Sequence, residues 1–304
     1  MAVWINTNSM ALTAQNSLGR NTNLVNRTME RLSSGSRINR TADDASGKAV
    51  SDSLINQIRS NRVAIQNAQD GFSILQIAEG SLQSMVDNLQ RIRELSVQIA
   101  SDTNGPDSRA AASQEIRTRL EEIDRLAQST NFNGVALLDG SATNSLLQIG
   151  SNSDITTNTI DLSVALTSVR LDSNTPINGL GLIDSAGTFI TSLDDIYDPV
   201  TGTAPVLNSN ANLQQFMGVV DAALGQVTQQ MSLVGSLQNR LDSTVNSLRG
   251  MVESFSASNS RIRDADIAQE TSSLVQSQLL QQASVNVLAQ ANRVPEMTLR
   301  LLEI

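Results

Sequence analysis

The chain has 304 residues, of which 39% are hydrophobic and only 2% aromatic, and its formal net charge is −9. It contains no cysteine and no histidine, which excludes disulfides, the usual zinc signatures and catalysis by Ser-His-Asp or Cys-His sets. Basic residues form no dense run and no apolar run approaches ~20 residues, so we expect neither nucleic-acid binding nor membrane insertion. The scarcity of aromatic residues for a pocket favours a protein that is not an enzyme and needs no cofactor.

The first predicted helix begins near the N-terminus. Apolar residues recur every three or four positions between Ala11 and Leu32, which predicts a helix over this segment. The polar phrase SSGSRINRTADD follows at 33–44. Its aspartates and Thr41 are candidate caps for the next helix.

Two further helices are predicted after this phrase. Apolar residues repeat at seven-residue intervals within about 44–103, as they do in a helix that packs along a seam, for example at Ile58, Ile65 and Phe72. A Gly-Pro pair within 101–108 ends this helix. A third helix is expected at about 108–129.

The middle of the chain changes in character. Asn133-Gly134 and Asp139-Gly140 are tight-turn dipeptides, so we predict β-hairpins over 131–171. Within them, apolar residues alternate with polar ones as in a half-buried strand, at Ile160, Leu162, Val164 and Leu166. Residues 172–211 are rich in Gly, Asn, Ser and Asp and predict a short irregular insert.

An acidic cluster within this insert is the best candidate for site chemistry. Asp194, Asp195 and Asp198 could bind a hard cation, and paired carboxylates also support glycoside hydrolysis. A solvated acidic loop explains the same residues and is the favoured interpretation.

The strongest periodic signal is a 3.5-residue repeat over 213–255, which predicts a coiled-coil helix about 65 Å long. Apolar residues occupy nearly every position of this seam: Leu213, Met217, Val220, Leu224, Val227, Met231, Val234, Leu241, Val245, Leu248, Val252 and Phe255. Gly218, Gly225 and Gly235 fall between seam positions, where close approach of a partner backbone could offset their cost.

A final helix is predicted over 266–292, with apolar residues around its whole circumference. Such a helix needs burial on several sides, and other copies of the chain are the natural cover. An ordinary buried core helix is the alternative. The residues concerned form the candidate polymerisation helix: Leu274, Leu279, Leu280, Val285, Val287 and Leu288.

The phrase SNSRIRDAD at 258–266 repeats the Ser-Arg-Ile motif of 33–44. If the two ends of the chain pair, these phrases lie side by side and their charges can meet within or between subunits. The predicted domain junction comprises Arg37, Arg40, Asp43, Asp44, Arg261, Arg263, Asp264 and Asp266.

Eight motifs in order make the chain resemble bacterial flagellin. They include MERLSSGSRINRTADDASGKAVSDSL at 29–54, LQRIRELSVQIAS at 89–101, FNGVALLDG at 132–140 and SRIRDADIAQET at 260–271. The resemblance covers roughly 1–170 and 212–304. It implies a mainly α fold of long antiparallel coiled-coil-like helices with paired termini and a small β-hairpin region.

The resemblance also implies a domain organisation. Residues 1–42 and 260–304 would form an inner terminal-helix domain. Residues 43–171 and 212–259 would form a long-helix shell domain, with hairpins at about 131–171. The insert at 172–211 leaves no large outer domain.

The function implied is that of a structural subunit that self-assembles into the extracellular flagellar filament for motility. It would be exported unfolded through the flagellar type III apparatus. The implied partners are other copies of the chain, an export chaperone at about 265–304, and the filament cap and hook-junction proteins. A hook–filament junction protein and a free-standing coiled-coil scaffold are the alternatives.

A candidate recognition patch concerns four individual residues. Arg91, Leu95 and Gln98 share a helix face by their spacing, which suits either a face satisfied by neighbouring groups or a recognition patch. In flagellins that Toll-like receptor 5 recognises, the corresponding face matches these three residues together with Glu115. The resemblance therefore implies a candidate host-receptor patch.

Overall fold

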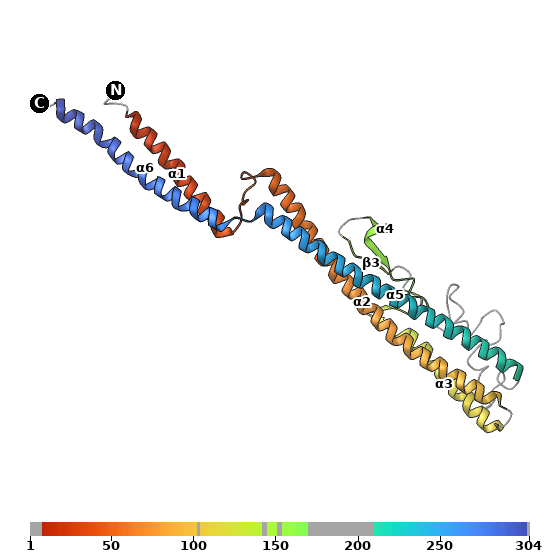
Figure 1. Ribbon diagram of the computed structural model, residues 1–304. Helices are drawn as coiled ribbons and strands as arrows, with labels where there is room; N and C mark the ends of the chain where they lie inside the picture. Colours follow the sequence, from red (N-terminus) through yellow and green to blue (C-terminus); the bar gives the residue numbers. More distant parts are fainter. Residues whose placement is uncertain (1–7, 102–103, 142–144, 151–153, 170–209, 303–304) are drawn as a thin grey trace. The chain divides into compact units, whose positions relative to one another are not determined.

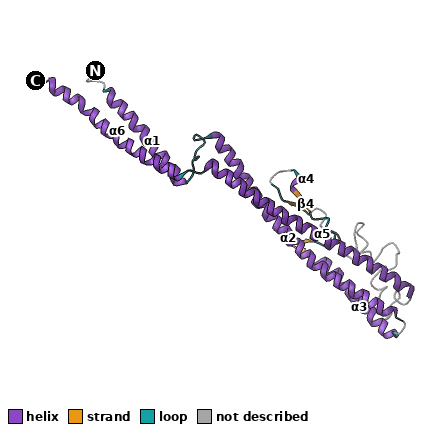
Figure 2. Cartoon of the chain, viewed as in Figure 1, coloured by secondary structure: helices purple, strands orange, loops and turns teal. Residues whose placement is uncertain are grey.

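The computed structural model describes residues 8–101, 104–141, 145–150, 154–169 and 210–302, and nearly all of this is helix (Figures 1 and 2). The prediction of a mainly α fold with small antiparallel hairpins is confirmed. The helices are α1 (Ser9–Ser34), α2 (Ala45–Ala100), α3 (Pro106–Ser129), α4 (Ile155–Asn158), α5 (Asn210–Arg263) and α6 (Ile267–Leu302). The strands are β1 (Asn131–Phe132), β2 (Val135–Ala136), β3 (Leu146–Gln148) and β4 (Thr159–Asp161).

The chain forms two compact units. The terminal unit comprises residues 1–59 and 252–304, and the central unit comprises residues 60–251. These units divide the chain within the continuous helices α2 and α5, whereas the sequence placed the domain boundaries in the polar phrases. The boundaries at 42 and 260 stay a prediction about domains.

The terminal unit is built on an antiparallel pair, α1 and α6 (Figure 1). Asn8 Nδ2 donates to the carbonyl of Ala291 at 2.8 Å, and Arg31 forms an ion pair with Glu270 at 3.4 Å. The start of α1 is therefore beside the last part of α6, and its end is beside the start of α6. Asn8 also caps α1, since its side chain accepts from the backbone N–H of Ala11.

The central unit packs α2, α3 and α5 around one apolar core. Residues at seven-residue intervals along α2 are buried in it, whereas Ile65 and Phe72 are partly buried against it. The buried set is Ala68, Leu75, Leu82 and Leu89, with Met85, Ile92 and Ile99. α5 contributes the predicted seam, with Leu213, Val220, Val227, Val234 and Leu241 buried. The 3.5-residue repeat thus identified the face of α5 that packs on its neighbours.

Two hairpins follow α3. In the first, Asn133 and Gly134 join β1 to β2 with positive φ angles of 51° and 81°, as a tight hairpin turn requires. In the second, β3 pairs antiparallel with β4, and Leu147 lies opposite Ile160. The predicted turn dipeptide Asn133-Gly134 is confirmed.

The strand predicted over Ile160–Leu166 is wrong beyond Asp161. The Asp161 side chain accepts from the backbone N–H and the hydroxyl of Ser163, which turns the chain away from the extended conformation. Val164 is consequently 54% exposed, although the alternation assigned it to the buried face.

The second hairpin rests on α2 at a glycine. A Cβ added to Gly71 would lie 2.5 Å from Cδ2 of Leu147, so only glycine lets this leucine approach the helix backbone. The adjacent Asn67 Nδ2 donates to the carbonyl of Gln148 at 3.0 Å. Together these contacts hold β3 against α2.

Candidate functional site

Several apolar side chains of α6 are largely exposed in the subunit, and some of them lie beside α1. Leu279 is 61% exposed and Val287 57%, and Leu280 and Val285 are close to half exposed. The remaining residues of the predicted polymerisation helix, Leu274 and Leu288, are half-buried. α1 is the one helix packed along α6 in the part of the chain that the structure describes, and one helix cannot cover a helix that is apolar all round.

α1 shows the same feature. Its exposed apolar residues include Met10 and Leu12, whereas its buried residues are confined to Ala14, Val25 and Thr28. Much of the α1–α6 contact is polar instead. Asn21 Nδ2 donates to Ser284 Oγ at 2.9 Å, and other side chains bond across the pair in the same way.

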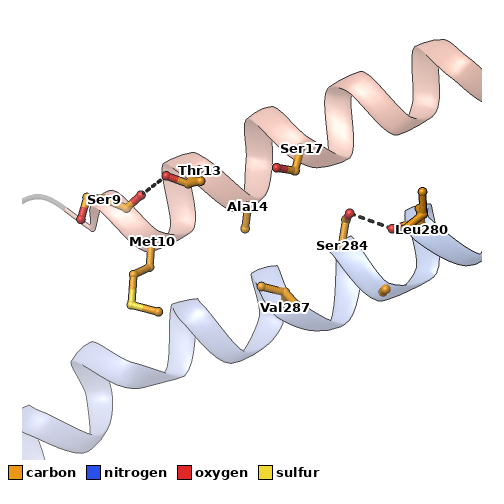
Figure 3. A pocket seen from close by; sticks show the side chains of 9 residues that line it. Ser9, Met10, Thr13, Ala14, Ser17, Leu280, Ser284 and Val287 are labelled. Carbon is orange, nitrogen blue, oxygen red and sulfur yellow. Dashed lines mark hydrogen bonds between the residues drawn. The ribbon is translucent and has the colours of Figure 1, made fainter. Parts of the chain in front are cut away.

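A groove of about 480 Å³ opens between the two helices near the start of α1 (Figure 3). Met10 reaches toward α6 on one side, and Val287 lies on the other. The hydrogen bonds drawn here, Thr13 to Ser9 and Ser284 to Leu280, both lie within a single helix. None of the hydrogen bonds drawn therefore crosses the groove from α1 to α6, and its lining is mainly apolar.

The two Ser-Arg-Ile phrases lie side by side and are joined through their backbones. Ser36 and Asp264 form an antiparallel bridge. The N–H of Arg37 donates to the carbonyl of Arg263 at 2.6 Å, and the N–H of Ala265 donates to the carbonyl of Gly35 at 2.9 Å. Gly35 ends α1 in the left-handed conformation, with φ 66°. The phrases thus make a short two-stranded junction.

The charged side chains of the junction bond to groups other than one another. Arg40 forms an ion pair with Glu30 at 3.0 Å, and Arg37 Nη2 donates to the carbonyl of Ile262 at 2.8 Å. Within the described ranges, no ion pair joins an arginine of one phrase to an aspartate of the other. The predicted charge meeting is therefore absent inside the subunit, because backbone and capping groups engage these side chains.

Asp44 and Asp266 cap the starts of α2 and α6, whereas Asp43 accepts from backbone groups of the loop before α2. The backbone N–H of Gly47 donates to Asp44 at 2.9 Å, and this bond is the main reason that the pKa of Asp44 lies below its ordinary value. The backbone N–H of Arg40 lowers the pKa of Asp43 in the same way. Asp266 accepts from the N–H of Ala268 at the start of α6.

Only some side chains of the candidate receptor patch are exposed. Arg91 Nε donates to Glu115 at 3.1 Å, and this hydrogen bond lowers the pKa of Glu115. Gln98 is exposed, but Leu95 is 2% exposed and belongs to the core of the central unit. The exposed part of the candidate patch is therefore Arg91, Glu115 and Gln98, and the receptor contact stays a prediction.

Three buried residues of α5, Phe216, Ala223 and Gln230, are not in the seam predicted from the sequence. Phe216 is completely buried, and Gln230 donates through Nε2 to the carbonyl of Ala165 at 2.8 Å. Gln230 also bonds to Thr167, so it fixes the segment after the second hairpin. A three-and-four spacing of buried positions at 216, 220, 223 and 227 was the available signal.

The acidic cluster Asp194, Asp195 and Asp198 lies outside the described residues. Among the residues that the structure does describe, no group of three acidic side chains is placed to hold a metal ion. No helix in that same part of the chain is long and apolar enough to cross a membrane. The features that remain for function are the uncovered terminal helices and the junction.

Comparison with known proteins decides the family. Residues 5–143 match the bacterial flagellin N-terminal helical region, and residues 217–302 match the bacterial flagellin C-terminal helical region. The chain belongs to the bacterial flagellin family. A flagellin of Bacillus subtilis is 39% identical over 98% of this chain and 99% of its own length, and a flagellin of Halalkalibacterium halodurans is 36% identical over the same shares.

A structural relative bears on the junction-protein alternative. A proposed flagellar hook-associated protein of Vibrio parahaemolyticus shares the fold, with a TM-score of 0.56, 13% identity, and coverage of 73% of this chain and all of its own. Identity at that level shows the fold alone. The Bacillus subtilis flagellin match spans 98% of the chain, so this flagellin is a subunit of the extracellular flagellar filament, a structural part of the motility apparatus.

Proposed function

We propose that this flagellin polymerises through the uncovered faces of α1 and α6, after export in the unfolded state by the flagellar type III apparatus. The observation that carries the proposal is the exposure of Leu279, Leu280, Val285 and Val287 on a helix that, among the described residues, packs along α1 alone. Apolar area exposed on this scale is stabilising only when another surface removes it from water.

The same proposal assigns the domains. Residues 1–42 and 260–304 form the inner domain that mediates assembly, and residues 43–171 and 212–259 form the shell around it. The central unit supports this assignment, because its helices already bury a complete apolar core within one subunit. The terminal helices, in contrast, leave their apolar faces for neighbours.

The experiment is seeded polymerisation of the purified chain. Short filament fragments added to monomer should grow into long filaments. A variant with Leu279→Ser and Val287→Ser should remain a folded monomer, with the melting temperature of the central unit unchanged. Discrete short oligomers from the wild-type chain would favour the hook–filament junction protein, whose class shares this fold.

Further partners follow from the same surfaces. An export chaperone is expected to cover the apolar face of α6 within 265–304 before assembly, and cap and hook-junction proteins are expected at the two filament ends. The Arg91–Glu115 pair with Gln98 is the exposed part of the candidate patch for Toll-like receptor 5. We also propose that the chain has no catalytic activity, since its role is structural.

A further inference from the structure

Five glycines lie inside the long helices of the central unit without any packing reason within the subunit. They are Gly80 in α2 and Gly218, Gly225, Gly235 and Gly250 in α5, and a Cβ added to any of them would meet nothing within 4 Å. Gly71 is different, because its added Cβ would collide with Leu147. Both helices run unbroken through all five positions.

Open glycines inside a helix lower its stability. Glycine loses more backbone freedom on folding than alanine, so each of these positions favours the unfolded chain relative to alanine. Alanine already occurs at exposed positions of α5, namely at Ala222 and Ala257. Alanine at these five positions would therefore raise the stability of the central unit without a steric clash inside the subunit.

Close approach of a second copy is the other reason for a helix to carry glycine. The arrangement does not explain all five in this way. At 100° per residue, Gly218, Gly225 and Gly250 lie within roughly 40° of one another on α5, but Gly235 lies roughly 80° around the helix from Gly225, and Gly80 lies on α2. A close-packed contact with one neighbour would therefore leave at least Gly80 and Gly235 unexplained.

We propose that these five glycines hold the stability of the central unit low enough for the subunit to unfold for export. This inference rests on the proposed export of an unfolded chain. In this proposal the open glycines serve export of the subunit through the type III apparatus, whereas the apolar side chains of α1 and α6 serve its assembly.

The test is a full-length variant in which all five glycines become alanine. Its melting temperature should rise by roughly 10 °C. In cells, its rate of appearance in the medium should fall at least about fivefold, because export then waits on a rarer unfolded state. Seeded polymerisation of the purified variant should match that of the wild type.

Two controls separate stability from other effects. The first control replaces four exposed glutamines of the same helices with alanine: Gln76, Gln214, Gln226 and Gln229. It should change neither the melting temperature nor the export rate, since glutamine and alanine differ little in helix propensity. Adding the core substitution Leu120→Ala to the five-alanine variant should return both melting temperature and export toward wild type, because Leu120 is fully buried.

Three results would overturn the inference: an unchanged melting temperature, a raised melting temperature with wild-type export, or lost polymerisation with wild-type export. The last would assign the glycines to contacts between copies. If the five-alanine protein is insoluble, the double variant Gly218→Ala with Gly225→Ala makes the same comparison at a roughly 4 °C shift. A wild-type chain that never leaves the cell would instead contradict the proposed function.

Discussion

The substitution Val234→Asp tests whether the α5 seam supports the folded subunit. Val234 is fully buried in the core of the central unit. Removing its side chain from the core forfeits about 1.5–3 kcal/mol of apolar burial. Placing a carboxyl group there without a hydrogen-bond partner costs about 2–3 kcal/mol more. The free energy of unfolding should therefore fall by about 4–6 kcal/mol.

For a unit of this size, that loss lowers the melting temperature by about 10–20 °C, which differential scanning calorimetry of the monomer measures directly. Ser232→Asp is the matched control, because Ser232 is exposed on the same helix and should shift the free energy by less than about 0.5 kcal/mol. Burial raises the pKa of the new carboxyl, so the folded variant binds its proton more tightly than the unfolded chain and loses stability as pH rises. The deficit against wild type should be smaller at pH 5 than at pH 7. Equal melting temperatures for wild type and Val234→Asp would refute a buried seam.

Three more predictions use the same monomer. Gly71→Ala should lower the free energy of unfolding by about 1–3 kcal/mol, because Leu147 must leave its place on α2; protection of the second hairpin from hydrogen exchange should fall with it. Removing residues 265–304 should leave a folded central unit, seen as an unchanged calorimetric transition, that no longer adds to filament seeds. The folded subunit holds the pKa of Glu115 below 4.5 through Arg91, so this contribution to stability is present above that pH and is lost as pH falls through the folded pKa. Glu115→Gln should show a shallower loss of melting temperature on acidification than wild type.

The helices could be predicted from the sequence because each rests on a repeat that one geometry imposes. Apolar residues at 3.5-residue intervals can share a buried face only in a helix, so α2 and α5 follow from their patterns. However, the 3.5-residue repeat describes the packing of a helix against a single neighbouring helix. Phe216 and Gln230 are buried because the face of α5 that packs is wider than a heptad seam, and a two-position template does not include them.

The errors concern contacts that depend on single side chains. The alternation through Val164 predicted a strand, but the bond from Ser163 to Asp161 turns the chain there. The Ser-Arg-Ile echo predicted two neighbouring phrases, and the Ser36–Asp264 bridge joins them, but their charged side chains do not pair with one another within the described subunit. Leu95 matches the candidate receptor patch by residue type, but residue type does not show that its side chain lies in the core of the central unit; the patch stays a prediction.

The central claim is that the exposed apolar side chains of α6 are buried by other copies of the chain. A filament reconstruction at side-chain resolution measures this directly. Leu279, Leu280, Val285 and Val287, which are 45–61% exposed in the subunit, should each fall to roughly 10% or less against neighbouring subunits. A filament in which these four side chains remain open to solvent would contradict the account.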